Sequence, residues 1–257
     1  MKKLYFLISI IILAAFVLGA CQPAATEAPE PTKPPPPTEA PMEEPTEAPM
    51  EEPALPDLGG REVTVAIENA YLPFNYILLE TGEAQGWDYD FMEEACKRLN
   101  CEVVWIQFGW DTMIQAVADG QFNMAADGIT ITEDRAKVVD YSDGYVAIEQ
   151  RILARIDEDR YDGPESFAAN PELIFGEQVG TTNYIAAVDL VGEDRVRSFD
   201  DFGLTVQALI SGDVDGVVID EVAGLGYMGA NKDELKLVGE TMSSDELGFI
   251  FTKGSDL

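Results

Sequence analysis

The stretch DGITITEDR, from Asp127 to Arg135, places acids, hydroxyls and one guanidinium within nine residues. Gly128 would allow a bound molecule to approach the backbone closely. Free backbone amides, the Thr130 hydroxyl and the Arg135 guanidinium would together form a receptor for a carboxylate, which arginine can bind through two parallel hydrogen bonds. The stretch therefore predicts a site for an anionic group.

The same stretch also fits an ordinary helix start. Thr130 or Thr132 would cap a helix whose first turn contains Arg135. A cation in that turn opposes the helix dipole. In this alternative the arginine pairs with a neighbouring acid, Asp134 or Asp140, and binds no ligand.

Two further turns carry suitable chemistry. In GTTNY, residues 180–184, a glycine precedes the hydroxyls of Thr181 and Thr182, which could hold the same carboxylate from the other side or merely cap a helix. In VVIDE, Asp220 ends an apolar strand. Its carboxylate could receive an ammonium group or could cap the following helix.

Two aromatic residues stand near other predicted strand ends. Tyr71 lies in ENAYLPFNY and Trp110 in FGWD. The two rings could enclose the side chain of a ligand, although aromatic residues in such places commonly pack in the core.

The composition excludes several classes of function. The chain has 48 acidic and 16 basic residues, a net charge of −32, and no histidine. Without histidine, Ser-His-Asp and Cys-His catalysis and the common zinc-ligand sets are excluded. A strongly acidic surface repels nucleic acid and anionic lipid. We expect no nucleic-acid partner, no metal and no cofactor.

Strand and helix patterns alternate through the mature part of the chain, which predicts an α/β fold with mainly parallel sheets. Trp87, Phe91, Ala95 and Leu99 recur every four residues, as on one face of a helix. In parallel sheets ligands bind beyond the carboxyl ends of the strands, where the turns described above fall. The predicted strands are 62–67, 102–108, 122–126, 145–156, 172–177, 195–199, 215–219, 235–238 and 247–252, and the predicted helices are 88–99, 110–117, 182–191, 201–211 and 220–229.

The first sixty residues predict export and anchoring. MKK and the apolar run that follows are typical of a signal peptide over residues 1–20, and LGAC resembles the bacterial lipobox, in which Cys21 carries a lipid. A plain transmembrane helix is the alternative. Residues 21–60 hold twelve of the 15 prolines and repeat TEAPMEEP in tandem. This composition predicts an extended tether or, alternatively, a proline-rich ligand for another domain.

The two remaining cysteines, Cys96 and Cys101, fall at a predicted helix end and strand start. In an exported chain a local disulfide between them is plausible. Two free buried thiols are the alternative, because spacing alone does not fix the geometry.

Taken in order, the motifs resemble the extracellular solute-binding proteins of polar amino-acid ABC transporters. The resemblance runs from about Val63 to Leu257 and is most specific in the central block, FGWDTMIQAVADGQFNMAADGITITEDRAKVVDYSDGY. It implies a type II periplasmic binding protein-like fold, in which two α/β lobes are joined by two crossing strands and close on a ligand. Lobe one would comprise 61–149 plus 244–257, and lobe two 150–243.

The resemblance also implies roles for the site residues. Arg135, with Thr130 and Thr182, would bind the α-carboxylate of an amino acid. Asp220 would bind the α-ammonium with the Gly128 carbonyl, and the two aromatic rings would pack on the side chain. The residues expected to contact the ligand are Glu68, Tyr71, Trp110, Asp127, Gly128, Thr130, Arg135, Thr181, Thr182 and Asp220.

Two positions depart from the family pattern. Glu68 stands where aspartate is common, and Asp127 stands where a small or hydroxyl residue is common. If both acids point inward they favour a cationic ligand such as arginine, lysine or ornithine. If they point outward the ligand is a neutral polar amino acid.

The resemblance implies a non-catalytic, monomeric receptor, lipid-anchored at the extracellular face of the cell membrane, that passes its amino acid to ABC permease subunits. The alternatives on the same fold are a cyclohexadienyl dehydratase-like enzyme, with Glu68 or Asp127 as the acid–base group, and the ectodomain of a sensor. Family members usually continue beyond FTKGSDL with further helices. We therefore expect a fragment or a truncated product, with apolar surface uncovered on lobe one.

Overall fold

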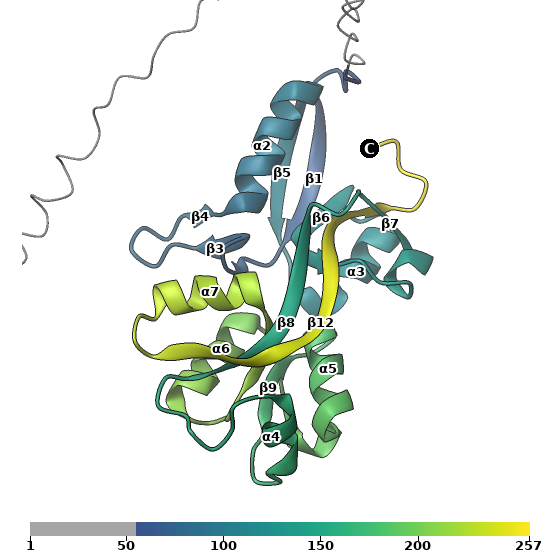
Figure 1. Ribbon diagram of the computed structural model, residues 1–257. Helices are drawn as coiled ribbons and strands as arrows, with labels where there is room; N and C mark the ends of the chain where they lie inside the picture. Colours follow the sequence, from purple (N-terminus) through teal and green to yellow (C-terminus); the bar gives the residue numbers. More distant parts are fainter. Residues whose placement is uncertain (1–54) are drawn as a thin grey trace, which may run out of the picture. The chain divides into compact units, whose positions relative to one another are not determined.

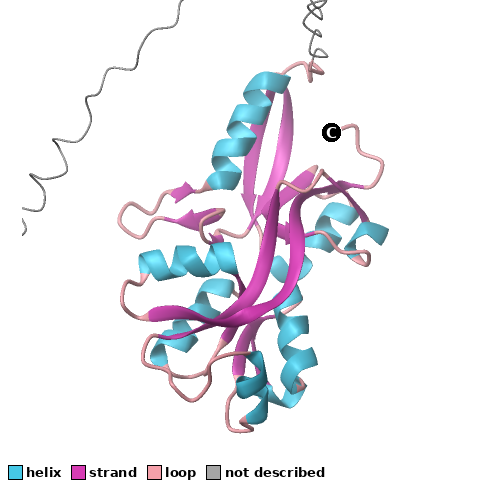
Figure 2. Cartoon of the chain, in the orientation of Figure 1, coloured by secondary structure: helices cyan, strands magenta, loops and turns pink. Residues whose placement is uncertain are grey.

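The computed structural model describes residues 55–257 (Figures 1 and 2). The predicted signal peptide, Cys21 and most of the predicted tether lie outside the described residues. Within residues 55–257, no helix is both long enough and apolar enough to cross a membrane.

One half of the described fold, here called the first lobe, is built on three parallel strands. β1 (Arg61–Ile67) lies between β5 (Cys101–Gln107) and β6 (Met124–Thr130). The helices α2 (Trp87–Leu99) and α3 (Trp110–Ala118) flank these strands (Figures 1 and 2). A small antiparallel sheet lies beside them, made of β2 (Ala70–Tyr71), β3 (Asn75–Ile77) and β4 (Ala84–Gln85).

Helix α2 packs through a different face from the one that its sequence pattern predicts. Met92 and Cys96 are buried, together with Asp88, whereas Trp87 and Phe91 remain 38% and 42% exposed. The contacting stripe is therefore shifted by one residue. An apolar groove borders this helix, and Phe91 lines it together with residues of β12.

The other half, the second lobe, combines short strands with four helices (Figure 1). Its parallel pair is β9 (Phe175–Gln178) with β10 (Val196–Phe199), and β11 (Val217–Asp220) pairs with β8 of the larger sheet. Its helices are α4 (Pro164–Ala169), α5 (Thr182–Val191), α6 (Phe202–Ser211) and α7 (Glu221–Ala230).

Two long antiparallel strands, β8 (Val146–Arg155) and β12 (Leu235–Thr252), run side by side through both lobes (Figure 1). β12 pairs with β6 and β7 (Val139–Tyr141) in the first lobe. Its register on β8 shifts between Val238 and Ser243. The strands β11, β8, β12, β6, β1 and β5 follow one another in this order in one seven-stranded sheet, and β7 pairs with β12 as its seventh strand. The two lobes therefore share a continuous backbone ladder.

The described residues form two apolar clusters in the first lobe and one in the second, and a fourth cluster joins the lobes. Val65, Met124 and Met113 are fully buried in the first lobe, and Phe167 stacks on Phe175 in the second. Burying side chains of this size contributes about 1.5–3 kcal/mol each. The joining cluster packs aromatic residues of the first lobe, Tyr71 and Phe74, with Phe202 and Tyr227 of the second.

Most predicted elements are present, but three predictions about the strands are wrong. The strand expected at 122–126 is β6, which continues to Thr130, so Asp127 and Gly128 belong to the strand and do not follow it. The separate strands expected at 235–238 and 247–252 are one strand, β12. The sheets are also not mainly parallel, because β8 and β12 pair antiparallel with each other and with their neighbours.

Cys96 and Cys101 form a disulfide between the end of α2 and the start of β5. This confirms the first of the two interpretations of these cysteines. The alternative of two free thiols is wrong.

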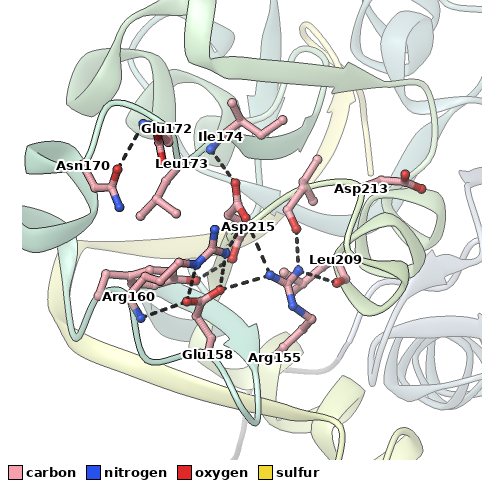
Figure 3. A network of polar contacts seen from close by, with 12 residues as sticks. Arg155, Glu158, Arg160, Asn170, Glu172, Leu173, Ile174, Leu209, Asp213 and Asp215 are labelled. Atoms are coloured by element: carbon pink, nitrogen blue, oxygen red, sulfur yellow. Dashed lines mark hydrogen bonds and ion pairs between the residues drawn. The ribbon is translucent and has the colours of Figure 1, made fainter.

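A buried ion-pair network lies in the second lobe (Figure 3). The Glu158 side chain is only 3% exposed and accepts hydrogen bonds from the guanidinium groups of Arg155, at 3.0 Å, and Arg160. Arg160 also pairs with Asp215, whose other oxygen accepts the Ile174 N–H at 3.0 Å. The hydrogen bonds and charges of these arginines, against the cost of burial, lower the pKa of Glu158 to about 2.

Candidate functional site

A small cavity lies between the two lobes. All ten residues that the sequence predicts to contact a ligand line this cavity. The lining residues are Glu68, Tyr71, Trp110, Asp127, Gly128, Thr130, Arg135, Gln178, Thr181, Thr182, Asn183, Phe202 and Asp220.

The cavity lies where several strands end. Glu68 directly follows β1, Thr130 is the last residue of β6, and Asp220 is the last residue of β11. Gln178 ends β9, two residues before the glycine of the turn into α5. Carboxyl ends of strands are where α/β sheets bind ligands, because the turns and helix starts that follow expose backbone amides there.

Arg135 is held beside the cavity by two backbone carbonyls and one aromatic ring. Its Nη1 donates to the Thr130 carbonyl at 3.0 Å and its Nη2 to the Gly180 carbonyl at 3.1 Å. The guanidinium carbon lies 5.2 Å from the centre of the Trp110 ring, within the range of a cation–π contact. Burial lowers the pKa of Arg135, but a guanidinium stays protonated in proteins. Arg135 therefore supplies a fixed positive charge at the cavity.

The alternative pairing of Arg135 with a neighbouring acid is wrong. Asp134 pairs with Lys137, and Asp140 pairs with Lys253. The predicted α-helix is also absent here, because only a single 3₁₀ turn, Arg135–Lys137, forms among these residues. The Thr132 hydroxyl accepts the Arg135 N–H at 3.2 Å, so it caps this short turn.

Two threonine hydroxyls meet across the cavity. Thr130 Oγ1 of the first lobe lies 3.2 Å from Thr182 Oγ1 of the second. Thr182 is the first residue of α5, and Thr181 caps that helix by accepting the Tyr184 N–H at 3.0 Å. The hydroxyls and the start of α5 thus extend the positive side of the cavity, because a helix N-terminus favours anions.

Asp220 provides the opposite charge. It is 2% exposed and accepts hydrogen bonds from the Tyr71 hydroxyl and from Asn183 Nδ2, the latter at 3.2 Å. Although Asp220 stands at the first turn of α7, its side chain caps no N–H of that helix, so the cap alternative is wrong. Burial raises the pKa of Asp220, and the two donors oppose that effect.

Gly128 is required by the packing of Tyr71. Its φ of +59° belongs to the left-handed region that favours glycine. A Cβ at this position would lie 2.4 Å from the Tyr71 ring. The Tyr71 ring therefore packs directly against the backbone of β6, and its hydroxyl donates to Asp220.

Glu68 and Asp127, whose orientation the sequence leaves open, both face the cavity and not the solvent. They are 9% and 4% exposed. The Glu68 N–H donates to Asp127 Oδ1 at 3.1 Å. Burial, reinforced by nearby acids, raises the pKa of Glu68 to about 7, and burial together with Glu68 raises the pKa of Asp127 well above its usual range.

Among residues 55–257, no lysine or arginine forms a salt bridge with Glu68, Asp127 or Asp220. A buried carboxylate without a cation is costly, and the protein responds by retaining the proton or by accepting hydrogen bonds. A bound molecule that carries positive charge would stabilise these groups in their ionised form. No cluster of three or more acids, cysteines or histidines in the described part could hold a metal ion.

Three lining residues were missed by the sequence analysis: Gln178, Asn183 and Phe202. Asn183 stands inside GTTNY, so its motif was recognised but its amide was not considered. Gln178 ends a strand, and the rule that ligands bind at carboxyl ends would have found it. Phe202 begins α6 with no signal that distinguishes it from a core aromatic residue.

Residues 63–255 match the model of the bacterial extracellular solute-binding proteins, family 3. The chain belongs to this family. The chain also matches solved structures of amino-acid-binding proteins over three quarters of its length. This confirms the two-lobe fold that the resemblance of the motifs implies.

Individual relatives of this family-3 protein are distant. It is 26% identical over 183 residues to a probable histidine-binding protein of Campylobacter jejuni, covering 71% of this chain and 69% of that one. An ancestral arginine-binding protein bound to glutamine superimposes with a TM-score of 0.69 at 31% identity, covering 76% of this chain and 85% of that one. The ancestral amino acid-binding protein AncCDT-1, a precursor of cyclohexadienyl dehydratase, superimposes with a TM-score of 0.68 at 28% identity, covering 75% and 82%.

Proposed function

We propose that this protein binds an α-amino acid between its lobes and releases it without chemical change. The observation that carries the proposal is the separation of charge in the cavity. Arg135, with two threonine hydroxyls, forms the positive side, and Asp220 forms the negative side. A zwitterion matches both, and a ligand that bridges the lobes stabilises their closed arrangement.

In this proposal the α-carboxylate binds the guanidinium of Arg135 and the hydroxyls of Thr130 and Thr182. The two bonds that Arg135 makes to carbonyls use two of the five N–H groups of a guanidinium. The α-ammonium binds Asp220 and the Gly128 carbonyl. Each end of the amino acid therefore meets a group of opposite charge.

We propose further that the side chain of the ligand is cationic, as in arginine, lysine or ornithine. Glu68 and Asp127 line the cavity and form no salt bridge among the described residues. The ammonium or guanidinium of such a side chain would offset the cost of their ionisation. A relative named for binding arginine supports this choice of ligand class, whereas other relatives are named for binding cystine and glutamate.

The remaining parts of the proposal concern transport. The signal peptide at 1–20 and the lipid on Cys21 would hold the protein at the outer face of the cell membrane, with residues 21–60 as a tether. The loaded monomer would then pass its amino acid to ABC permease subunits. We also propose lobe boundaries at 61–149 plus 244–257 and at 150–243, and the passage of β8 and β12 from one lobe to the other supports them.

A thermal-shift screen against the twenty amino acids and ornithine tests the proposal. A ligand at 100 times its Kd adds about 2.7 kcal/mol to the free energy of unfolding, which raises the midpoint by several degrees. Arg135→Ala should abolish the shift. Lys137→Ala is the matched control, because Lys137 lies in the same turn and, within residues 55–257, pairs only with the exposed Asp134. No shift from any amino acid, in a protein shown to be folded, would disprove the proposal.

One enzymatic alternative has a specific observation in its favour. A pKa of about 7 suits Glu68 to general acid–base catalysis, and AncCDT-1 is named as a precursor of a dehydratase. Turnover of a cyclohexadienyl substrate such as prephenate would establish the enzyme. A thermal shift with amino acids and no turnover would establish the binding protein.

A further inference from the structure

One hydrogen-bonded contact joins the two lobes at the acidic part of the cavity. Gln178 ends β9 of the second lobe, and Glu68 follows β1 of the first. Gln178 Nε2 lies 2.8 Å from Glu68 Oε1 and 3.1 Å from Oε2. The same nitrogen lies 3.1 Å from the Asp200 carbonyl, which fixes the amide from its own lobe.

This contact favours the ionised form of Glu68. An amide NH₂ group only donates hydrogen bonds, so it suits a carboxylate whose two oxygens accept. The backbone N–H of Trp110, at the start of α3, adds a second donor at 3.4 Å from Oε1. A protonated Glu68 would have to turn its O–H away from these donors.

Other groups around Glu68 oppose its ionisation. Burial is the largest influence, and the acids Asp201, ahead of α6, and Asp111, in α3, add to it. Asp127 on β6 accepts the Glu68 N–H, and Tyr227 on α7 also faces this charge. The donors offset these influences in part, Gln178 most strongly, and leave the pKa of Glu68 at about 7.

We propose that Gln178 is a specificity-determining residue, which holds Glu68 as a carboxylate across the closed cavity and thereby biases the site toward ligands with a cationic side chain. The role rests on the proposed function. Because donor and acceptor come from different lobes, closure and ionisation of Glu68 favour each other. The charge of the site is then set by the same movement that encloses the ligand.

The experiment compares Gln178→Leu, which removes the donor at similar volume, with Gln107→Leu. Gln107 is a matched control because its amide donates to the backbone carbonyl of Glu68, at 3.4 Å, and not to its carboxylate. The Glu68 carboxyl is titrated by ¹³C NMR in the ligand-free protein and assigned with Glu68→Gln. We expect the pKa of Glu68 to rise by about one unit in Gln178→Leu and to stay unchanged in Gln107→Leu.

Ligand preference is measured on the same proteins by calorimetry at pH 7.5, with arginine and its uncharged analogue citrulline. The preference for arginine should fall about tenfold in Gln178→Leu and remain in Gln107→Leu. Gln178→Met carries the same expectation if the leucine variant does not fold.

The outcomes separate two failures. The role of Gln178 is wrong if wild-type protein prefers arginine and Gln178→Leu keeps that preference. It is also wrong if the pKa of Glu68 is the same in Gln178→Leu and in wild type. In both cases the proposed function stands. If the folded wild-type protein binds neither molecule nor any other amino acid, the proposed function is wrong and the selectivity role falls with it.

Discussion

Glu158 in the second lobe and Glu68 in the cavity are both buried carboxylic acids, but their surroundings differ in charge. Glu158 accepts hydrogen bonds from two arginines, which lower its pKa to about 2 (Figure 3). Glu68 has an amide and a backbone N–H as its donors, and burial raises its pKa to about 7.

This difference in surroundings suggests different roles for the two carboxylates: Glu158 stabilises the fold, and we propose that Glu68 serves ligand binding. The ionisation of Glu158 is compensated within the protein, so its network stabilises the fold and needs no ligand. The ionisation of Glu68 is compensated only in part. A cation on a bound ligand would supply the rest of the compensation, and we propose that this makes the cavity selective.

The largest effect is expected at Asp220, another buried acid that forms no salt bridge among the described residues. Asp220→Asn keeps the shape of the side chain and removes the charge that meets the α-ammonium. Affinity for the amino acid should fall by at least about 30-fold, because losing one partner of a buried charge pair costs about 2–5 kcal/mol. Calorimetric titration measures the loss. The free energy of unfolding at pH 8 should not decrease, and a strongly destabilised variant would argue for a structural role.

The next largest effect is expected on stability. Glu158→Gln should lower the free energy of unfolding at pH 7 by about 2–3 kcal/mol, since it removes the charge of one of the two carboxylates that both arginines contact. The pKa of Glu158 is lowered in the fold, so its stabilisation is present above about pH 4.5 and is lost as the pH falls toward 2. Urea unfolding at several pH values shows this, and amino-acid affinity should remain unchanged. A variant as stable as wild type would contradict the account of the network.

A smaller effect of opposite sign is expected at Glu68. Its pKa is raised in the fold, so between about pH 4.5 and 7 the folded state holds more protons than the unfolded state, and stability decreases as the pH rises. Glu68→Gln removes this cost. The ligand-free variant should be about 1–2 kcal/mol more stable than wild type at pH 8 and equally stable at pH 4. A loss of stability at pH 8 would show that the Glu68 charge is compensated within the protein after all.

The sequence predicts the cavity better than it predicts the elements around it. Arg135, Asp220 and the other eight proposed residues all line the cavity, because the carboxyl ends of strands are recognisable from local patterns. The α-helix expected at Thr130 is absent, since pairing with β12 extends β6 through this residue. Local capping signals do not report such tertiary pairing.

The contacts between the lobes could not be predicted from the sequence. Gln178 and Glu68 are 110 positions apart, and their meeting depends on how β8 and β12 bring the two sheets together. The buried face of α2 was misassigned for a related reason. The four-residue spacing fits both Trp87 with Phe91 and Met92 with Cys96, and only the packing against β5 and β12 decides between them.

The most direct test of the account is a calorimetric titration of the wild-type protein at pH 8 with L-arginine and with L-citrulline. Both molecules offer the same zwitterionic end to Arg135 and Asp220, and they differ in the charge of the side chain that meets Glu68. We predict that arginine binds at least about tenfold more tightly than citrulline. Equal binding of the two, tighter binding of citrulline, or no binding of either to folded protein would contradict the account.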